Sequence, residues 1–417
     1  MTILHECRAA LAAAETYLEQ ARAAVAARVA RGGRVDTAAL EAEQMAAHGL
    51  AWIATYVAAL RETARWAGRL DDAGTIGATE TAILALGFAE YGAQLAGGIP
   101  MSGVEAVRPT DLGVQPEAAA AALHTAFAPL TARIPAARAT LTDSLAAGGF
   151  GAVALEDEAT ILLRESFARF TAAEVAPHAQ AWHEANALIP LDLIAKLGEL
   201  GTFGVTIAEE HGGLGLGKVA MCLVSEMLSE GYVGVGSLGT RSEIAGELIG
   251  LNGTPAQKAR WLPGIASGDI LPTAVFTEPN TGSDLANLRT RAVREGGIYR
   301  VHGAKTWITH GSRSDVMTLL VRTDPDAPGH RGLSMLLAPK PRGTEADPFP
   351  ASGMTGTEIH VLGYRGMREY EIAFEGFEVP ADGLLGGVEG QGFRQLMETF
   401  ESARIQTAAR ALGVAQN

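Results

Sequence analysis

Residues 274–311 read AVFTEPNTGSDLANLRTRAVREGGIYRVHGAKTWITHG, and this stretch decides the fold of the chain. Its β-prone start stops at Glu278-Pro279, because a proline cannot donate to a sheet ladder. The next residues, Asn280 to Asp284, are typical of a turn. The strand is therefore expected to end with free amides and small hydroxyls, which suit an anionic or acceptor-rich ligand.

The second half of this stretch has the alternation of a half-buried strand over residues 298–302, after a hairpin turn at Gly296-Gly297. Further on, Trp307 and Thr309 are two residues apart and are expected on one face of a strand. An indole and a hydroxyl on the same face can pack on a flavin ring and hydrogen-bond its edge. For any single piece, the alternative is an ordinary sheet with a buried tryptophan and two turns.

Together and in this order, the pieces resemble the middle domain of the acyl-CoA dehydrogenases, whose pattern is close to TEPxxGSD followed by a K-x-WITNG strand. His310 stands where the family commonly has asparagine. Residues 204–215, GVTIAEEHGGLG, are similar to the family's PxExGGxG loop, with Ala208 in place of the proline. Residues 253–268, GTPAQKARWLPGIASG, are also similar to the family and predict a helix capped by Thr254.

The chain is too long for one core, so several domains are expected. An extra alanine-rich helical domain is predicted over residues 1–150, with helices at 5–30, 36–70, 75–95 and 116–147 and an irregular loop at 97–113. The resemblance covers residues 155–417 and implies an α+β fold. It places the family's N-terminal helical domain at 151–269, a middle β-barrel-like domain at 270–388 and the first helix of a C-terminal bundle at 389–417. That last helix has an apolar face but no C-cap glycine, so the chain is expected to stop inside the bundle.

Composition excludes several classes of protein. No apolar run approaches the roughly 20 residues that a spanning helix needs, and the N-terminus lacks the pattern of a secretory signal. We therefore expect a cytoplasmic protein without membrane contact. The formal net charge of −14 disfavours a nucleic-acid partner. Cys7 and Cys222 have no Cys/His cluster around them, so neither a metal site nor a disulfide framework is expected.

The resemblance implies FAD as the cofactor. Phe276 and Thr277 match the residues that contact the flavin pyrimidine, Ser283 lies on the pyrophosphate side, and Trp307 and Thr309 lie by the ring near N5. Ser283 also belongs to the substrate-binding set that the resemblance implies, together with an arginine that opens the last domain, matched here by Arg404.

The reaction that the family implies is α,β-dehydrogenation of an acyl-CoA thioester, with electrons passed to an electron-transferring flavoprotein. The implied assembly is a homodimer or homotetramer. Most members carry the catalytic base late in the C-terminal bundle, so the base is expected beyond Asn417. A minority place it one residue before the arginine matched by Arg404, where this chain has Ala403, and Glu401 would point elsewhere on the helix.

The substrate is suggested by the added helical domain and by residues 237–249, SLGTRSEIAGELI. They favour a member that acts on a branched dicarboxylic acyl-CoA such as methylsuccinyl-CoA. Arg241, expected in or just before the first turn of a helix, would hold the distal carboxylate; a surface arginine paired with Glu243 or Glu247 is the alternative. A short- or branched-chain acyl-CoA dehydrogenase, or a non-catalytic flavin-binding relative of the alkylation-response type, remains possible at this point. The role of residues 1–150 is open.

Overall fold

Two units make up the chain, residues 1–155 and residues 156–417. The structure is a computed structural model that describes residues 2–155 and 157–417. Each unit has its own hydrophobic core. No helix in the described part of the chain combines the length and the apolar character needed to cross a membrane. Those same residues hold no cluster of three or more His, Cys, Asp or Glu side chains arranged for a metal ion.

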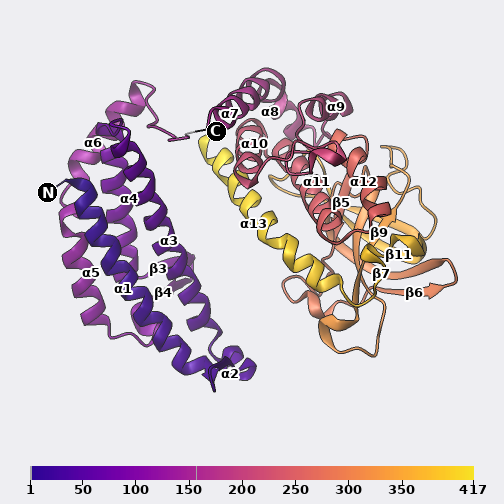
Figure 1. Ribbon diagram of the computed structural model, residues 1–417, viewed down its shortest axis with the longest axis horizontal. Helices are drawn as coiled ribbons and strands as arrows, with labels where there is room; N and C mark the ends of the chain where they lie inside the picture. The colour runs from indigo at the N-terminus through magenta and orange to yellow at the C-terminus, as the bar shows by residue number, and fades with distance from the viewer. Residues whose placement is uncertain (1, 156) are drawn as a thin grey trace. The chain divides into compact units, whose positions relative to one another are not determined.

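The first unit is a helical bundle in which α1, α3, α4 and α5 run side by side (Figure 1). Its helices are α1 (Ile3–Val29), α2 (Thr37–Ala42), α3 (Gln44–Asp72), α4 (Ala78–Gly97), α5 (Pro116–Thr131) and α6 (Ile134–Ala146). Small and apolar residues recur at three- and four-residue steps, so each long helix buries one stripe. Arg133 adds a bidentate ion pair to Glu6, with N–O distances of 2.8 and 2.9 Å, which ties the start of α6 to α1.

Three details of this unit differ from the sequence prediction. Residues 36–70 form two helices that meet at the non-helical Glu43. Residues 116–147 also form two, because Pro135 cannot continue a helix from within and instead occupies the first turn of α6. The segment 97–113 was expected to be irregular but contains the hairpin of β3 (Ile99–Ser102) and β4 (Glu105–Val107). Pro100 fits there because both strands of a two-stranded sheet are edge strands.

The second unit combines helices with one sheet. Its helices before the sheet are α7 (Glu158–Phe170), the π-helical turn η2 (Thr171–Val175), α8 (Ala176–Glu184), α9 (Leu191–Glu199), α10 (Lys218–Gly231), α11 (Val233–Asn252) and α12 (Pro255–Ser267). The predicted start of α12 is confirmed. The Thr254 hydroxyl accepts from the amide of Gln257, and the Gln257 side chain accepts in return from the amide of Thr254.

The seven-stranded sheet has the order β10-β11-β7-β6-β8-β5, with β9 paired to β8. Its strands are β5 (Pro272–Val275), β6 (Arg291–Glu295), β7 (Ile298–Thr309), β8 (Val316–Arg322), β9 (Leu333–Pro339), β10 (Met354–Ile359) and β11 (Glu369–Pro380). Most neighbours are antiparallel, but β8 is parallel to both β5 and β6. Strands β8 and β9 are buried almost throughout, because both of their faces are covered. The α+β fold expected from the sequence is thus confirmed.

The last helix, α13 (Gly392–Gln416), packs along α10 and α11 (Figure 1). Its buried residues are largely polar and recur at helical spacing: Gln395, Thr399, Ser402, Gln406 and Arg410. Apolar residues of the predicted face remain exposed, with 48% of Ile405 and 57% of Leu412 accessible. The helix is therefore held by hydrogen bonds to its neighbours as well as by apolar contact.

Candidate active site

The loop after β5 is a tight turn with an exposed tip. Glu278 and Thr281 exchange two backbone hydrogen bonds of 3.0 Å, which close the turn around Pro279. Phe276 is buried at the base, whereas Gly282 and Ser283 are exposed. Within the described residues, the amides of Gly282 and Ser283 donate to no protein acceptor. The tip therefore offers the free donors that the sequence predicts.

A buried ion pair fixes this loop to the sheet. The Lys305 ammonium on β7 is fully buried and donates to the Phe276 carbonyl at 2.9 Å and to Glu278 Oε1 at 3.1 Å. Glu278 also accepts from the amides of Arg289 and Thr290 at 2.7 and 2.8 Å. Burial lowers the pKa of Lys305 to about 8, although Glu278 opposes this shift. Within the described residues, Glu278 is the carboxylate that compensates the buried charge of Lys305, so the loop conformation depends on this pair.

The strand alternation predicted for β7 holds at its start and fails at Trp307. Tyr299 and Val301 are fully buried, but a bulge shifts the register between Tyr370 and Ile372 on the facing strand β11. Trp307 has φ +58° and remains 56% exposed, while Thr309 is buried. The expectation that Trp307 and Thr309 share one face of a regular strand is wrong, because the extra residue of the bulge rotates the indole outward.

Thr309 ends β7 opposite Glu369, the first residue of β11. The Thr309 hydroxyl donates to Glu369 Oε2 at 3.0 Å, and the Thr309 carbonyl accepts from the Thr273 hydroxyl at 2.6 Å. Glu369 is only 4% exposed, and burial raises the pKa of its carboxyl, against the opposing effects of Thr309 and Arg241. A buried carboxyl that no sequence motif indicated is therefore hydrogen-bonded to the threonine that is predicted to contact the flavin.

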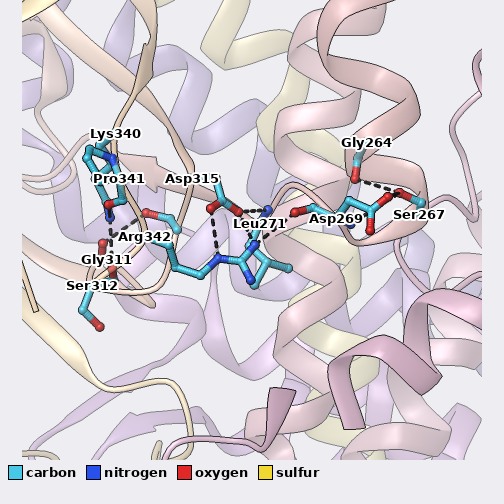
Figure 2. A network of polar contacts seen from close by, with 11 residues as sticks. Gly264, Ser267, Asp269, Leu271, Gly311, Ser312, Asp315, Lys340, Pro341 and Arg342 are labelled. Atoms are coloured by element: carbon cyan, nitrogen blue, oxygen red, sulfur yellow. Dashed lines mark hydrogen bonds and ion pairs between the residues drawn. The ribbon is translucent and has the colours of Figure 1, made fainter. Parts of the chain in front are cut away.

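The residues that follow Thr309 are held by a second polar network. Figure 2 shows Asp315 between the backbone amide of Leu271 and the guanidinium of Arg342. The amide donates at 2.7 Å, and Arg342 makes a two-pronged contact at 2.9 and 2.5 Å. The Lys340 ammonium donates to the Ser312 carbonyl at 3.0 Å in the same network. These contacts join the starts of β5 and β8 to the end of β9 and so fix the end of β7.

Arg241 lies in the middle of α11, which begins at Val233. The prediction that it occupies the first helical turn is wrong, because residues 233–240 are already helical. The effect of the helix dipole on a charged side chain is confined to the terminal turns, so it does not act on Arg241. Its alternative partners are occupied elsewhere: the Lys218 ammonium binds Glu243 at 2.8 Å and Glu247 at 3.0 Å. Among the described residues Arg241 has no ion-pair partner, and its Nε is buried without an acceptor.

A second arginine without a carboxylate partner lies near the same face of α11. Arg410 of α13 is 8% exposed and donates to the hydroxyls of Ser237 and Tyr364 at 2.6 and 2.7 Å. Its Nε is also buried without an acceptor in the described part of the chain. Ser237 precedes Arg241 by one helical turn, so both cations are presented toward one face of α11.

Arg404 differs from these two arginines. It is exposed on α13, and its Nε donates to the carbonyl of Phe400 at 2.9 Å in its own helix. The structure therefore does not bring Arg404 together with Arg241 and Thr309. Arg410 could have been found from the sequence, since it continues the polar series of Ser402 and Gln406 at four-residue steps.

Known proteins identify the fold that carries this site. Family models for the acyl-CoA dehydrogenase N-terminal and middle domains match residues 157–269 and 273–377. The chain belongs to the acyl-CoA dehydrogenase family, whose members are FAD-dependent oxidoreductases. It is 58% identical over 415 residues to (2S)-methylsuccinyl-CoA dehydrogenase of Cereibacter sphaeroides, which covers 98% of this chain and 75% of that relative.

Solved structures of the family match just under two thirds of this chain. An acyl-CoA dehydrogenase from Geobacillus kaustophilus has a TM-score of 0.58 at 33% identity, covering 64% of this chain and 67% of that chain. A glutaryl-CoA dehydrogenase from Mycobacterium smegmatis in complex with FADH2 has a TM-score of 0.56 at 28% identity, covering 63% of each chain. This chain therefore spans about two thirds of the length of these structures.

The residues present fit a flavin. Trp307 presents a large aromatic face to the outside, and a flat conjugated ring is a suitable partner for it. The free amides at Gly282 and Ser283 suit phosphate or carbonyl oxygens. The expectation of FAD as cofactor is confirmed by the family.

Replacing Thr309 with alanine is expected to weaken flavin binding by roughly 1–3 kcal/mol, because it removes a buried hydroxyl and leaves Glu369 without its donor. Flavin retention and the visible spectrum of the holoenzyme measure the effect. Thr318→Ala is the matched control, since Thr318 is equally buried but donates to the Thr273 carbonyl within the sheet. Equal flavin retention in the two variants would show that Thr309 does not face the cofactor.

Proposed function

We propose that this protein oxidises (2S)-methylsuccinyl-CoA to mesaconyl-CoA as a step of the ethylmalonyl-CoA pathway. The observation that carries this proposal is a pair of arginines, half-buried Arg241 and buried Arg410, which have no carboxylate partner among the described residues, in a chain 58% identical to a methylsuccinyl-CoA dehydrogenase. An acyl group with a second carboxylate supplies the anion that both cations lack. A short- or branched-chain monocarboxylic substrate would leave them uncompensated.

The flavin would be held by the loop after β5 and by the end of β7. Phe276 and Thr277 would line the pyrimidine side, Ser283 the pyrophosphate, and Trp307 and Thr309 the ring. A bound flavin supplies the acceptor for the hydride that leaves the β-carbon of the acyl group. Lys305 would not contact the flavin itself; its ammonium donates to the Phe276 carbonyl and so holds the loop in place.

The substrate would lie with its acyl end toward α11. Arg241 can form a bidentate contact with the distal carboxylate, which a lysine could not form in the same geometry. Ser283 is at the exposed tip of the flavin loop, and Arg404 is on the accessible face of α13, so both would meet the CoA portion. Enclosure of the acyl end by α11, α13 and the sheet would exclude water from the reacting carbons.

We further propose an electron-transferring flavoprotein as the redox partner, a homodimer or homotetramer as the assembly, and the cytoplasm as the location. The formal charge of −14 gives no support to the alternative in which nucleic acid replaces an acyl-CoA, because that role needs a basic surface.

The test is a substrate comparison with the flavin-loaded enzyme. Mesaconyl-CoA formation from methylsuccinyl-CoA is measured with an electron-transferring flavoprotein as acceptor, alongside crotonyl-CoA formation from butyryl-CoA. If the proposal is right, kcat/KM for methylsuccinyl-CoA exceeds kcat/KM for butyryl-CoA by at least ~100-fold. Discrimination of this size is expected when a buried charge must be matched. Equal or better use of butyryl-CoA would reject the dicarboxylic substrate.

A further inference from the structure

Glu369 is a buried acid in which one of the two carboxyl oxygens has no hydrogen-bond partner among the described residues. Oε2 accepts from the Thr309 hydroxyl at 3.0 Å, whereas Oε1 is buried and meets no donor among the described residues. The side chain is 4% exposed. An ionised carboxylate with one unsatisfied oxygen is costly to bury, so this site favours the neutral acid.

One cation counteracts that preference. Arg241 lowers the pKa of Glu369, although it lies beyond the 4.0 Å limit of an ion pair. Arg241 and Glu369 each have a buried polar atom without a partner in the described part of the chain. The charge of Arg241 acts on the carboxyl that accepts the Thr309 hydroxyl, and so links the residue that would bind the substrate to the threonine that would contact the flavin.

The other charged groups nearby do not replace Arg241. Arg368, next in sequence, pairs with Glu345 at 3.2 Å and with Glu358 at 3.5 Å. The Tyr370 hydroxyl accepts from Ser312 at 2.9 Å.

His310 adds no charge of its own. Burial and the surrounding cations lower its pKa to about 3, so it is neutral at physiological pH. Those cations are Arg313, Arg342, Arg241 and Lys340. Among these four cations, Arg241 is the one whose charge lowers the pKa of Glu369.

We propose that Glu369 is a positioning residue that takes up a proton from solvent when an anionic acyl group binds Arg241, and that this proton changes the hydrogen bond of Thr309. The inference rests on the proposed function, because it requires a carboxylate at Arg241. The bound anion cancels the positive charge that favours ionised Glu369, while burial continues to favour the neutral acid. Once Glu369 carries a hydrogen, Thr309 is no longer held as a donor to a carboxylate. Its hydroxyl can then direct its hydrogen toward the flavin edge, so occupancy of the acyl site is communicated to the cofactor.

The experiment measures proton uptake when product binds to the oxidised holoenzyme. Mesaconyl-CoA is titrated calorimetrically at one pH in buffers of different ionisation enthalpy, and crotonyl-CoA, which has no second carboxylate, serves as the matched ligand. The expected result is net proton uptake with mesaconyl-CoA and none with crotonyl-CoA. The flavin spectrum of the mesaconyl-CoA complex is expected to depend on pH.

Glu369→Gln keeps the shape of the side chain and an acceptor for Thr309 but cannot titrate. It is expected to bind mesaconyl-CoA without proton uptake and with a pH-independent flavin spectrum. Unchanged uptake in Glu369→Gln, or no uptake in the wild type while mesaconyl-CoA still binds selectively through Arg241, would overturn the inference alone. If mesaconyl-CoA and crotonyl-CoA bind equally and Arg241→Ala weakens both to the same degree, the proposed function fails and the inference fails with it.

Discussion

Arg241→Ala is expected to lower kcat/KM for methylsuccinyl-CoA by at least ~100-fold, while turnover of butyryl-CoA changes little or improves. The half-buried guanidinium has no ion-pair partner among the described residues, and the nearby carboxylates of Glu243 and Glu247 are bound by Lys218. A distal carboxylate that enters this site without Arg241 would be buried unpaired, which costs roughly 3–5 kcal/mol. Butyryl-CoA brings no such charge.

Two further variants make the result specific. Arg241→Lys keeps the charge but loses the two-pronged contact, so it should fall between the wild type and the alanine variant. Arg300→Ala removes an exposed arginine that pairs with Glu295 and Glu378 on the sheet surface, and it should leave both substrates unaffected. If Arg241→Ala slows both substrates equally, the residue is structural, and the substrate assignment should be withdrawn in favour of the broader family.

Local sequence chemistry predicted the scaffold well. Residues whose role depends on their nearest neighbours in sequence behave as expected. Thr254 caps α12, and the side chains of Tyr299 and Val301 are buried in the core beside the sheet. The order and spacing of the motifs were sufficient to predict the family and its cofactor. These features need no knowledge of distant parts of the chain.

The functional side chains were harder to place, because their environment is created by segments far apart in sequence. The bulge that turns Trp307 outward depends on the register with β11, which no alternation in β7 reveals. The sequence prediction places Arg241 too early in its helix, because α11 already begins at Val233 and includes glycines at 234, 236 and 239, which are poor helix formers. Those glycines are helical in the structure, and Gly234 and Gly236 are sites of close packing where a Cβ would meet the Arg365 carbonyl and the Ser229 hydroxyl. Glu369 became a candidate only when the sheet placed it opposite Thr309.

The largest expected effect on stability comes from the buried ion pair beneath the flavin loop. Lys305→Met is expected to reduce the free energy of unfolding by roughly 3–5 kcal/mol, because it leaves Glu278 buried without the cation that pairs with it in the described part of the chain. Urea unfolding measures this loss, and Arg300→Met, which breaks a solvent-screened surface pair, should change the unfolding midpoint little. The double variant Lys305→Met/Glu278→Gln should recover part of the loss, since the unpaired charge is then gone.

The same lysine gives a pH signature. Its pKa is about 8 in the folded protein and 10.5 ordinarily, so between these values the unfolded chain binds more protons than the folded chain. The contribution of Lys305 to the free energy of unfolding therefore rises with pH across that window, and Lys305→Met should remove the rise. Because Lys305 also fixes the Phe276 carbonyl, the variant should lose flavin as well. A variant that unfolds at the wild-type urea concentration with the wild-type pH dependence would show that the loop keeps its conformation without this pair.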